Sequence, residues 1–354
     1  MTDLEKLCSR VTEAADCAVI TDDVNRRYFT AMKSSAGTLV VFPEKAYFII
    51  DFRYIEKARK TVKACEVILQ DKLYEQINSL IEKHGAKTVS VNADTCTLSE
   101  LIAYQQKLNA EVIADTKLAE IIREIRTVKS QEQIDKIIKA QRIAEKGFAH
   151  MLDFIKVGRT EKEIQLELDY YMLKNGAEAL SFDTIALSGS NTSLPHGVPS
   201  DKKVESGEFV LMDFGATYDG WHSDMTRTVC VGKPSNKMKS VYETVLTAQL
   251  TALDSVKAGM SGKALDKIAR DIINEAGYGD NFGHSLGHGV GVEIHESPYA
   301  SPSREDILPE NSIVTVEPGI YLEGKFGVRI EDFVVVTENG CINMTKAPKE
   351  LICL

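Results

Sequence analysis

An internal repeat is the feature that most constrains how this chain can fold. A long amphipathic helical pattern leads to a glycine, a Thr or Ser then begins a second helix, and that helix ends at another glycine. Apolar strands follow each copy. The two copies, 101 residues apart, are marked by Gly158, Thr160 and Gly176 and by Gly259, Ser261 and Gly277. A helix pair and a sheet that occur twice predict one domain with internal pseudo-twofold symmetry.

Two carboxylates lie in the strands of the first copy. In the stretch VLMDFGATYDGWHSDMTRT, Asp213 and Asp224 stand 11 positions apart on two apolar runs, and Asp219-Gly220 between them is typical of a tight turn. Strands that fold back on each other would bring both acids to one sheet. An unpaired ionised carboxylate is costly in an apolar strand. The pattern alone therefore leaves open an ion pair, a raised pKa or a bound metal.

The second copy also delivers two acids. Glu317 and Glu331 stand 14 positions apart at the ends of two apolar strands. Two pseudo-symmetric hairpins would thus bring four acids to a shared centre, where they cannot all ionise without a compensating cation. The second copy therefore favours a metal site over an ion pair.

Histidines supply a further ligand for such a site. Five of the seven histidines lie between His196 and His295, and glycines flank His288 on both sides, which lets the imidazole approach a crowded centre. Four carboxylates and one neutral imidazole form a hard, oxygen-rich set. This set suits two divalent metal ions, with Mn²⁺ or Co²⁺ favoured and Zn²⁺ as an alternative.

Residues 1–124 alternate short strand and helix patterns before the repeat begins. They predict a smaller α/β domain without a glycine-rich phosphate loop. Residues 125–354 open with a helix that Ser130 and Gln133 would cap, and they contain both copies of the repeat. We therefore expect an α+β protein with two domains.

Composition excludes several classes of function. The formal net charge is −10 and no Lys/Arg-rich stripe is present, so nucleic acid is not an expected partner. No run approaches about 18 apolar residues, and the first residues form no apolar export signal, so no membrane span is expected. Seven scattered cysteines without ligand spacing are typical of reduced thiols. These patterns predict a cytoplasmic protein.

Five stretches of the sequence together resemble a known family: MDFGATYDGWHSDMTRT, LPHGVP, HSLGHGVGVEIHE, TVEPGIY and VRIEDFVVV. They are similar to the metallopeptidases that cut next to proline, Xaa-Pro dipeptidase (prolidase) and aminopeptidase P. The resemblance implies the "pita-bread" catalytic fold, which these enzymes share with methionine aminopeptidase and creatinase. It covers the chain from about residue 125 to the end. The first domain resembles the creatinase-type amino-terminal domain more loosely.

The resemblance also implies roles for individual residues. It implies that Asp224 and Glu331 bridge two metal ions, that Asp213 binds one ion, and that His288 and Glu317 bind the other. Glu317 would also move the proton of the attacking water. His196 and His295 would contact the substrate and stabilise the reaction intermediate.

The implied activity is hydrolysis of the Xaa-Pro bond in dipeptides or short peptides by a homodimer. The sequence does not decide between prolidase and aminopeptidase P. The alternatives are another exopeptidase or amidinohydrolase of the same fold, or a peptide-binding protein without activity. The roles of His222 and His284 stay open. Arg329 is expected to pair with an inner carboxylate or to meet a substrate carboxylate.

Overall fold

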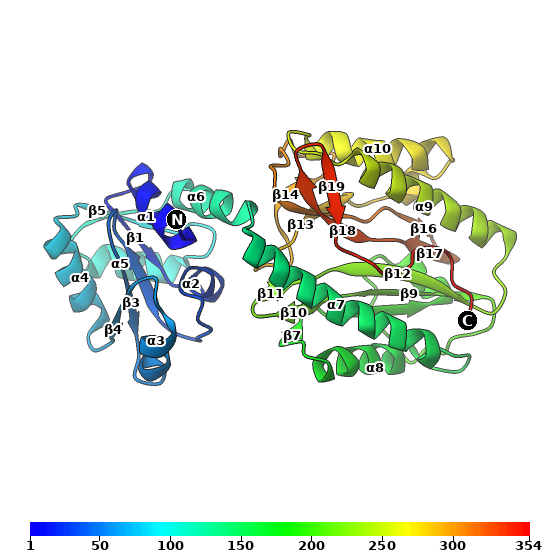
Figure 1. Cartoon of the computed structure of the whole chain (residues 1–354), viewed down its shortest axis with the longest axis horizontal. Helices are drawn as coiled ribbons and strands as arrows, with labels where there is room; N and C mark the ends of the chain where they lie inside the picture. The colour runs from blue at the N-terminus through cyan, green and yellow to red at the C-terminus, as the bar shows by residue number, and fades with distance from the viewer. The chain divides into compact units, whose positions relative to one another are not determined.

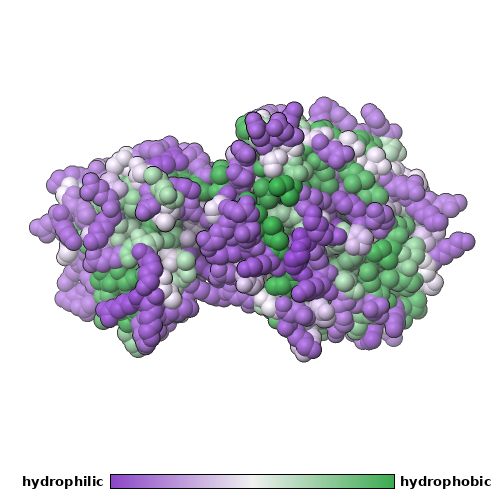
Figure 2. All heavy atoms as spheres, viewed as in Figure 1, coloured by the Kyte–Doolittle hydropathy of each residue, from purple (hydrophilic) through white to green (hydrophobic).

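The computed structural model describes all 354 residues. The chain forms two compact units, Met1–Arg126 and Thr127–Leu354. None of its helices combines the length and the apolar character that crossing a membrane requires. Hydrophilic residues cover most of the face drawn in Figure 2, and apolar residues form smaller areas between them.

The first unit is built on one mixed six-stranded sheet with the strand order β4-β3-β2-β1-β5-β6. Its strands are β1 Cys17–Ile20, β2 Thr38–Val41, β3 Ala46–Ile50, β4 Glu66–Leu69, β5 Thr88–Val91 and β6 Glu111–Ile113. Its helices are α1 Asp3–Arg10, α2 Asp23–Thr30, α3 Ile55–Thr61, α4 Leu73–His84, α5 Leu98–Lys107 and α6 Lys117–Thr127. Alternate strand residues feed two apolar cores, one under α1, α2, α3 and α6 and the other under α4 and α5. The expected α/β domain is confirmed.

The second unit contains the two predicted helix pairs. They are α7 Gln131–Phe154 with α8 Glu161–Lys174, and α9 Asn236–Ser255 with α10 Gly262–Glu275. Ser130, Thr160 and Ser261 cap α7, α8 and α10 with their hydroxyl groups. The glycines after α8 and α10 both have positive φ angles, 107° at Gly176 and 84° at Gly277.

The strands of the second unit also repeat. The first copy contains β7 Ala179–Leu180, β8 Ile185–Ser188, β9 Glu208–Phe214, β10 Ala216–Tyr218, β11 Trp221–His222 and β12 Met225–Val231. The second contains β13 Gly287–Gly289, β14 Glu296–Ala300, β15 Ile313–Val316, β16 Gly319–Leu322, β17 Phe326–Arg329, β18 Asp332–Thr337 and β19 Gly340–Asn343. In each copy two long antiparallel strands, β9 with β12 and β15 with β18, are separated by a short hairpin. The predicted pseudo-symmetry is confirmed.

Each helix pair packs on the strands of its own copy. In Figure 1, α7 and α8 lie on one side of the strands and α9 and α10 on the other. One core joins α7 and α8 to β9 and β12, and a second joins α9 and α10 to β15 and β18. The strand ends that carry the four acids therefore lie between two layers of helices.

Candidate metal centre

Strand register places the first two acids on one face. Asp213 lies in β9 opposite Thr226 of β12. Asp224 precedes Thr226 by two positions, and because side chains alternate along a strand, all three residues share one face. The predicted Asp219-Gly220 turn is confirmed, with φ angles of 49° and 82°, although it closes β10 and β11 rather than β9 and β12.

The second two acids occupy matching positions. Val316 of β15 pairs with Asp332 of β18, so Glu317 and Glu331 stand opposite each other one step beyond the ladder. The two copies meet at these acids. The Glu331 N–H donates to the Thr226 carbonyl at 3.1 Å, and the Thr226 hydroxyl donates to Glu331 Oε2 at 2.8 Å.

His288 faces the acids from β13. A Cβ atom on Gly287 would lie 2.0 Å from the carbonyl oxygen of Thr315, which confirms the expected crowding. Nδ1 of His288 lies 3.1 Å from the Gly289 carbonyl, and because a carbonyl only accepts, Nδ1 carries the proton. Nε2 is then left with a lone pair, 3.6 Å from Asp224 Oδ2 and 3.4 Å from Glu317 Oε1.

Burial shifts the pKa values of three of the acids and of His288. Burial and the neighbouring acids raise the pKa of Asp224 and of Glu331 well above their usual range, and burial raises that of Glu317 to about 8. Burial lowers the pKa of His288 to about 3. Without a cation the cluster would therefore hold protons, and a bound dication would favour the ionised carboxylates and the neutral imidazole.

The donor atoms of the cluster fit a metal ion. Oδ1 of Asp213 and Oε1 of Glu331 are buried and accept no hydrogen bond. In both residues the other carboxylate oxygen is held, by Arg329 and by Thr226 respectively. Ligand atoms of Asp224, His288 and Glu331 lie within 4.8 Å of one another. Buried oxygens without partners, grouped around a neutral imidazole nitrogen, are the arrangement that a divalent cation would satisfy.

The Arg329 side chain is buried in the site and contacts one of its acids. Its side chain is 3% exposed and forms an ion pair with Asp213. It also donates to the Tyr321 hydroxyl at 2.7 Å and to Thr226 Oγ1 at 3.0 Å. The expected pairing with an inner carboxylate is confirmed.

The cluster lines a cavity of about 490 Å³. All the site residues predicted from the sequence reach its wall: His196, Asp213, Asp224, His288, His295, Glu317 and Glu331. The ring centroids of His295 and His288 are 4.3 Å apart, and burial lowers the pKa of His295. Apolar wall comes from Phe182, Ile185 and Ile294.

The two histidines left open by the sequence have different positions. His284 lines the cavity, and its Nε2 lies 2.8 Å from the Tyr321 hydroxyl. Burial lowers the pKa of His284 to about 4, so the ring is neutral at pH 7. His222 lies in β11, where its Nδ1 is 3.3 Å from the Thr217 hydroxyl, and it is not part of the cavity wall.

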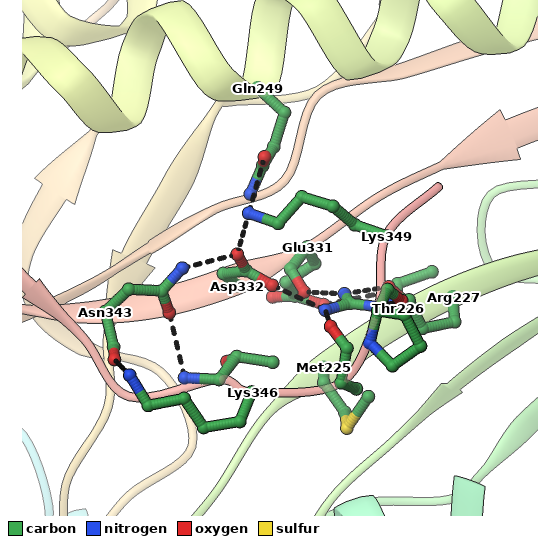
Figure 3. A network of polar contacts seen from close by, with 12 residues as sticks. Met225, Thr226, Arg227, Gln249, Glu331, Asp332, Asn343, Lys346 and Lys349 are labelled. Carbon is green, nitrogen blue, oxygen red and sulfur yellow. Dashed lines mark hydrogen bonds and ion pairs between the residues drawn. The ribbon is translucent and has the colours of Figure 1, made fainter. Parts of the chain in front are cut away.

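Sequence reasoning missed a polar network directly behind Glu331 (Figure 3). Arg227 of β12 is 1% exposed and forms an ion pair with the fully buried Asp332 at 2.7 Å. Burial acts to raise the pKa of Asp332, but Arg227 and Lys349 outweigh it, so that pKa is lowered. The other N–H groups of Arg227 donate to the carbonyls of Thr226, Glu331, Ala347 and Pro348. Two charged residues beside apolar stretches, Arg227 within β12 and Asp332 at the start of β18, were the signal that could have revealed this network.

Two families match the two parts of the chain. Residues 4–128 match the creatinase/prolidase N-terminal domain, and residues 135–338 match metallopeptidase family M24. The chain belongs to metallopeptidase family M24. The pita-bread fold expected from the sequence is confirmed by solved structures of relatives.

Three relatives show how far this family likeness extends. An uncharacterized peptidase of Bacillus subtilis is 45% identical and covers 96% of each chain. The structure of an Xaa-Pro dipeptidase from Bacillus anthracis has a TM-score of 0.96 at 41% identity and covers 99% of each chain. The structure of an X-Pro aminopeptidase from Thermotoga maritima has a TM-score of 0.90 at 38% identity, covering 96% of this M24 chain and 98% of its own.

Proposed function

We propose that this chain is a metal-dependent peptidase that hydrolyses the Xaa-Pro bond of dipeptides or short peptides. The observation that carries the proposal is the buried group of four acids and His288 in one cavity, with two carboxylate oxygens that have no partner. Full-length similarity to proteins named Xaa-Pro dipeptidase and X-Pro aminopeptidase supports the substrate class. None of the five expected ligand positions is substituted, which disfavours a peptide-binding protein without activity.

Two divalent ions, Mn²⁺ or Co²⁺ before Zn²⁺, are the proposed cofactors. Asp213, Asp224, His288, Glu317 and Glu331 would hold them. The unpartnered Oδ1 of Asp213 and Oε1 of Glu331 support this assignment. When bound, such ions polarise a carbonyl group and lower the pKa of water.

Glu317 is the proposed proton carrier. The Thr315 hydroxyl donates to its Oε1 at 3.1 Å, which fixes the carboxylate on the cavity wall. From there it would accept the proton of the attacking water and pass it to the proline nitrogen that leaves. That nitrogen needs a proton because it would otherwise leave as a strongly basic amide anion. In an Xaa-Pro bond it carries no N–H of its own before cleavage.

His295 and His196 are the proposed substrate contacts. A neutral imidazole keeps one N–H, and His295 would donate it to the oxygen that becomes negative as the carbonyl is attacked. His196 would hold the substrate beside the scissile bond. Phe182, Ile185 and Ile294 offer an apolar surface for the proline ring, which presents no donor.

The assay offers the metal-stripped protein an Xaa-Pro dipeptide and an Xaa-Pro-Xaa tripeptide with Mn²⁺, Co²⁺ or Zn²⁺. Cleavage of the dipeptide alone would identify a prolidase, and preference for the tripeptide an aminopeptidase P. Folded protein that cleaves neither peptide with any of the three metals would refute the proposal.

We further propose a cytoplasmic homodimer. The seven free cysteines support a reducing compartment, and resemblance to the family supports the dimer. Analytical ultracentrifugation of the purified chain tests the dimer, which a single monomeric species at micromolar concentration would exclude.

A further inference from the structure

A buried carboxylate outside the cavity organises one of its walls. Glu161, the first residue of α8, is fully buried. Its Oε1 accepts from the Ser188 N–H at 2.7 Å and from the Asn191 side-chain amide at 3.0 Å. Its Oε2 accepts from the Ser200 N–H at 3.0 Å and from the Ser200 hydroxyl at 2.6 Å. The hydroxyl of Ser188 donates as well.

The chemistry of these contacts suits a side chain that only accepts hydrogen bonds. Every partner of Glu161 is a donor, and a carboxylate is the side chain that only accepts. The position at the start of α8 also favours negative charge, because the helix dipole is positive there. No Lys or Arg pairs with this carboxylate, and the neutral groups that donate to it all lie between residues 188 and 200.

These donors belong to one loop, which carries His196. Ser188 begins the loop, Asn191 lies within it and Ser200 ends it. The loop leaves β8 at Ser188, passes through a 3-10 turn over Gly189–Ser193 and returns at Ser200. Its middle is poorly buried, since Leu194 is 54% and Val198 83% exposed. Packing therefore does little to fix the position of the His196 side chain. The hydrogen bonds at the two ends of the loop, at Ser188 and Ser200, matter more for that position.

Two contacts from β17 hold the same loop. The Gly327 N–H donates to the Thr192 hydroxyl at 2.8 Å, and Arg329 donates to the Pro195 carbonyl at 3.3 Å. Glu161 holds the loop from the start of α8 and is not part of the cavity wall. The loop that carries His196 is therefore held by contacts from α8 and from β17.

We propose that Glu161 is a positioning residue that sets His196 on the wall of the active-site cavity. This inference rests on the proposed function, because it gives His196 a substrate to contact. A glutamine at position 161 would have the same size as the glutamate, but its amide N–H₂ would face the N–H or hydroxyl donors at one end of the loop. Those donors would then have no acceptor. Glu161→Gln should therefore displace the loop without altering any metal ligand.

The test measures kcat and KM of Glu161→Gln on an Xaa-Pro peptide, its metal affinity by calorimetry, and hydrogen exchange over residues 188–200. We expect kcat/KM to fall at least about tenfold, since small misplacements of a substrate contact cost this much or more. Metal affinity should stay within twofold of the wild type, and exchange should be faster at Ser188 and Ser200.

A matched control is Asp16→Asn. Asp16 lies in the first unit, where it accepts from the Lys87 and Thr88 N–H groups at 2.7 and 3.0 Å, and it does not line the cavity. This control should leave kcat/KM unchanged. Should Glu161→Gln fail to fold, Ser200→Ala removes one donor to the same carboxylate and should lower kcat/KM a few-fold.

A double variant shows whether Glu161 acts through His196. Adding Glu161→Gln to His196→Ala should lower kcat/KM by less than about twofold more, because the positioned group is already gone. Losses that multiply fully, or a Glu161→Gln enzyme as active as the wild type, would overturn the inference. A wild-type protein that cleaves no Xaa-Pro peptide would instead refute the proposed function, and hydrogen exchange would still test the anchor.

Discussion

Replacing Arg227 with methionine should destabilise the second unit strongly. The change removes the guanidinium but keeps an unbranched apolar stem. Asp332 would remain buried and keep its contacts with Lys349 and Asn343, while four backbone carbonyls would lose a donor. Breaking a buried ion pair costs about 3–5 kcal/mol, and buried acceptors without donors add to the loss. Because Asp332 keeps two partners, we expect a loss of about 4 kcal/mol in the free energy of unfolding.

The chain offers a specific probe for this measurement. Trp221 is the only tryptophan and is buried in the second unit, so its fluorescence during urea unfolding reports on that unit alone. The control is Lys267→Met, which breaks an exposed pair with Asp271 and should change stability by less than about 1 kcal/mol. A loss for Arg227→Met no larger than that of the control would refute the reasoning.

Three further predictions concern the metal centre. Folding raises the pKa of Glu317 from 4.5 to about 8 and lowers the pKa values of His284 and His288 below their usual value of 6.5. Above about pH 6.5 these histidines are neutral in both states, so the native metal-free protein binds more protons than the unfolded chain between about pH 6.5 and 8. Its stability, measured by urea unfolding, should fall as pH rises from about 6.5 to 8, and a flat profile over this range would contradict this. Asp224→Asn should abolish metal binding in calorimetry while the circular dichroism spectrum stays unchanged, and normal occupancy of two ions would remove Asp224 as a bridging ligand. Gly287→Ala should lower the free energy of unfolding by more than about 2 kcal/mol, because the new Cβ would lie 2.0 Å from the Thr315 carbonyl oxygen. The control is Gly283→Ala, whose Cβ would meet no atom within 4 Å. Equal effects of both substitutions would contradict the crowding argument.

The repeat and the strand acids could be predicted because they have strong local signals. Capping residues and terminal glycines mark helix ends within a few positions of sequence, so α7, α8 and α10 were expected near their observed bounds. Asp213 and Glu331 stood out because an acid beside an apolar strand is costly without a partner. In the structure both residues retain one oxygen without a hydrogen bond.

The supporting residues could not be predicted because their burial depends on distant segments. Glu161 and Glu163 both lie in the first turn of α8 and look alike in the sequence. Glu163 caps the helix at its surface, while Glu161 is covered by a loop that begins 27 residues later at Ser188. Arg227 likewise finds its hydrogen-bond partners only when β18 and the segment around Ala347 pack against it.

Short helices were also beyond the sequence patterns. Helices α2 and α3 have 8 and 7 residues, too few for a clear apolar period. They form because the sheet of the first unit offers Phe29 and Ala58 an apolar surface on which to pack.

The central claim is that two bound divalent ions make this chain hydrolyse Xaa-Pro bonds. The most direct measurement titrates Mn²⁺ into the metal-stripped protein and follows bound metal and cleavage of an Xaa-Pro peptide in the same samples. Our account predicts that cleavage appears as binding approaches two ions per chain. Folded protein that binds two ions and leaves the peptide intact, or that cleaves it fully without metal, would contradict the account.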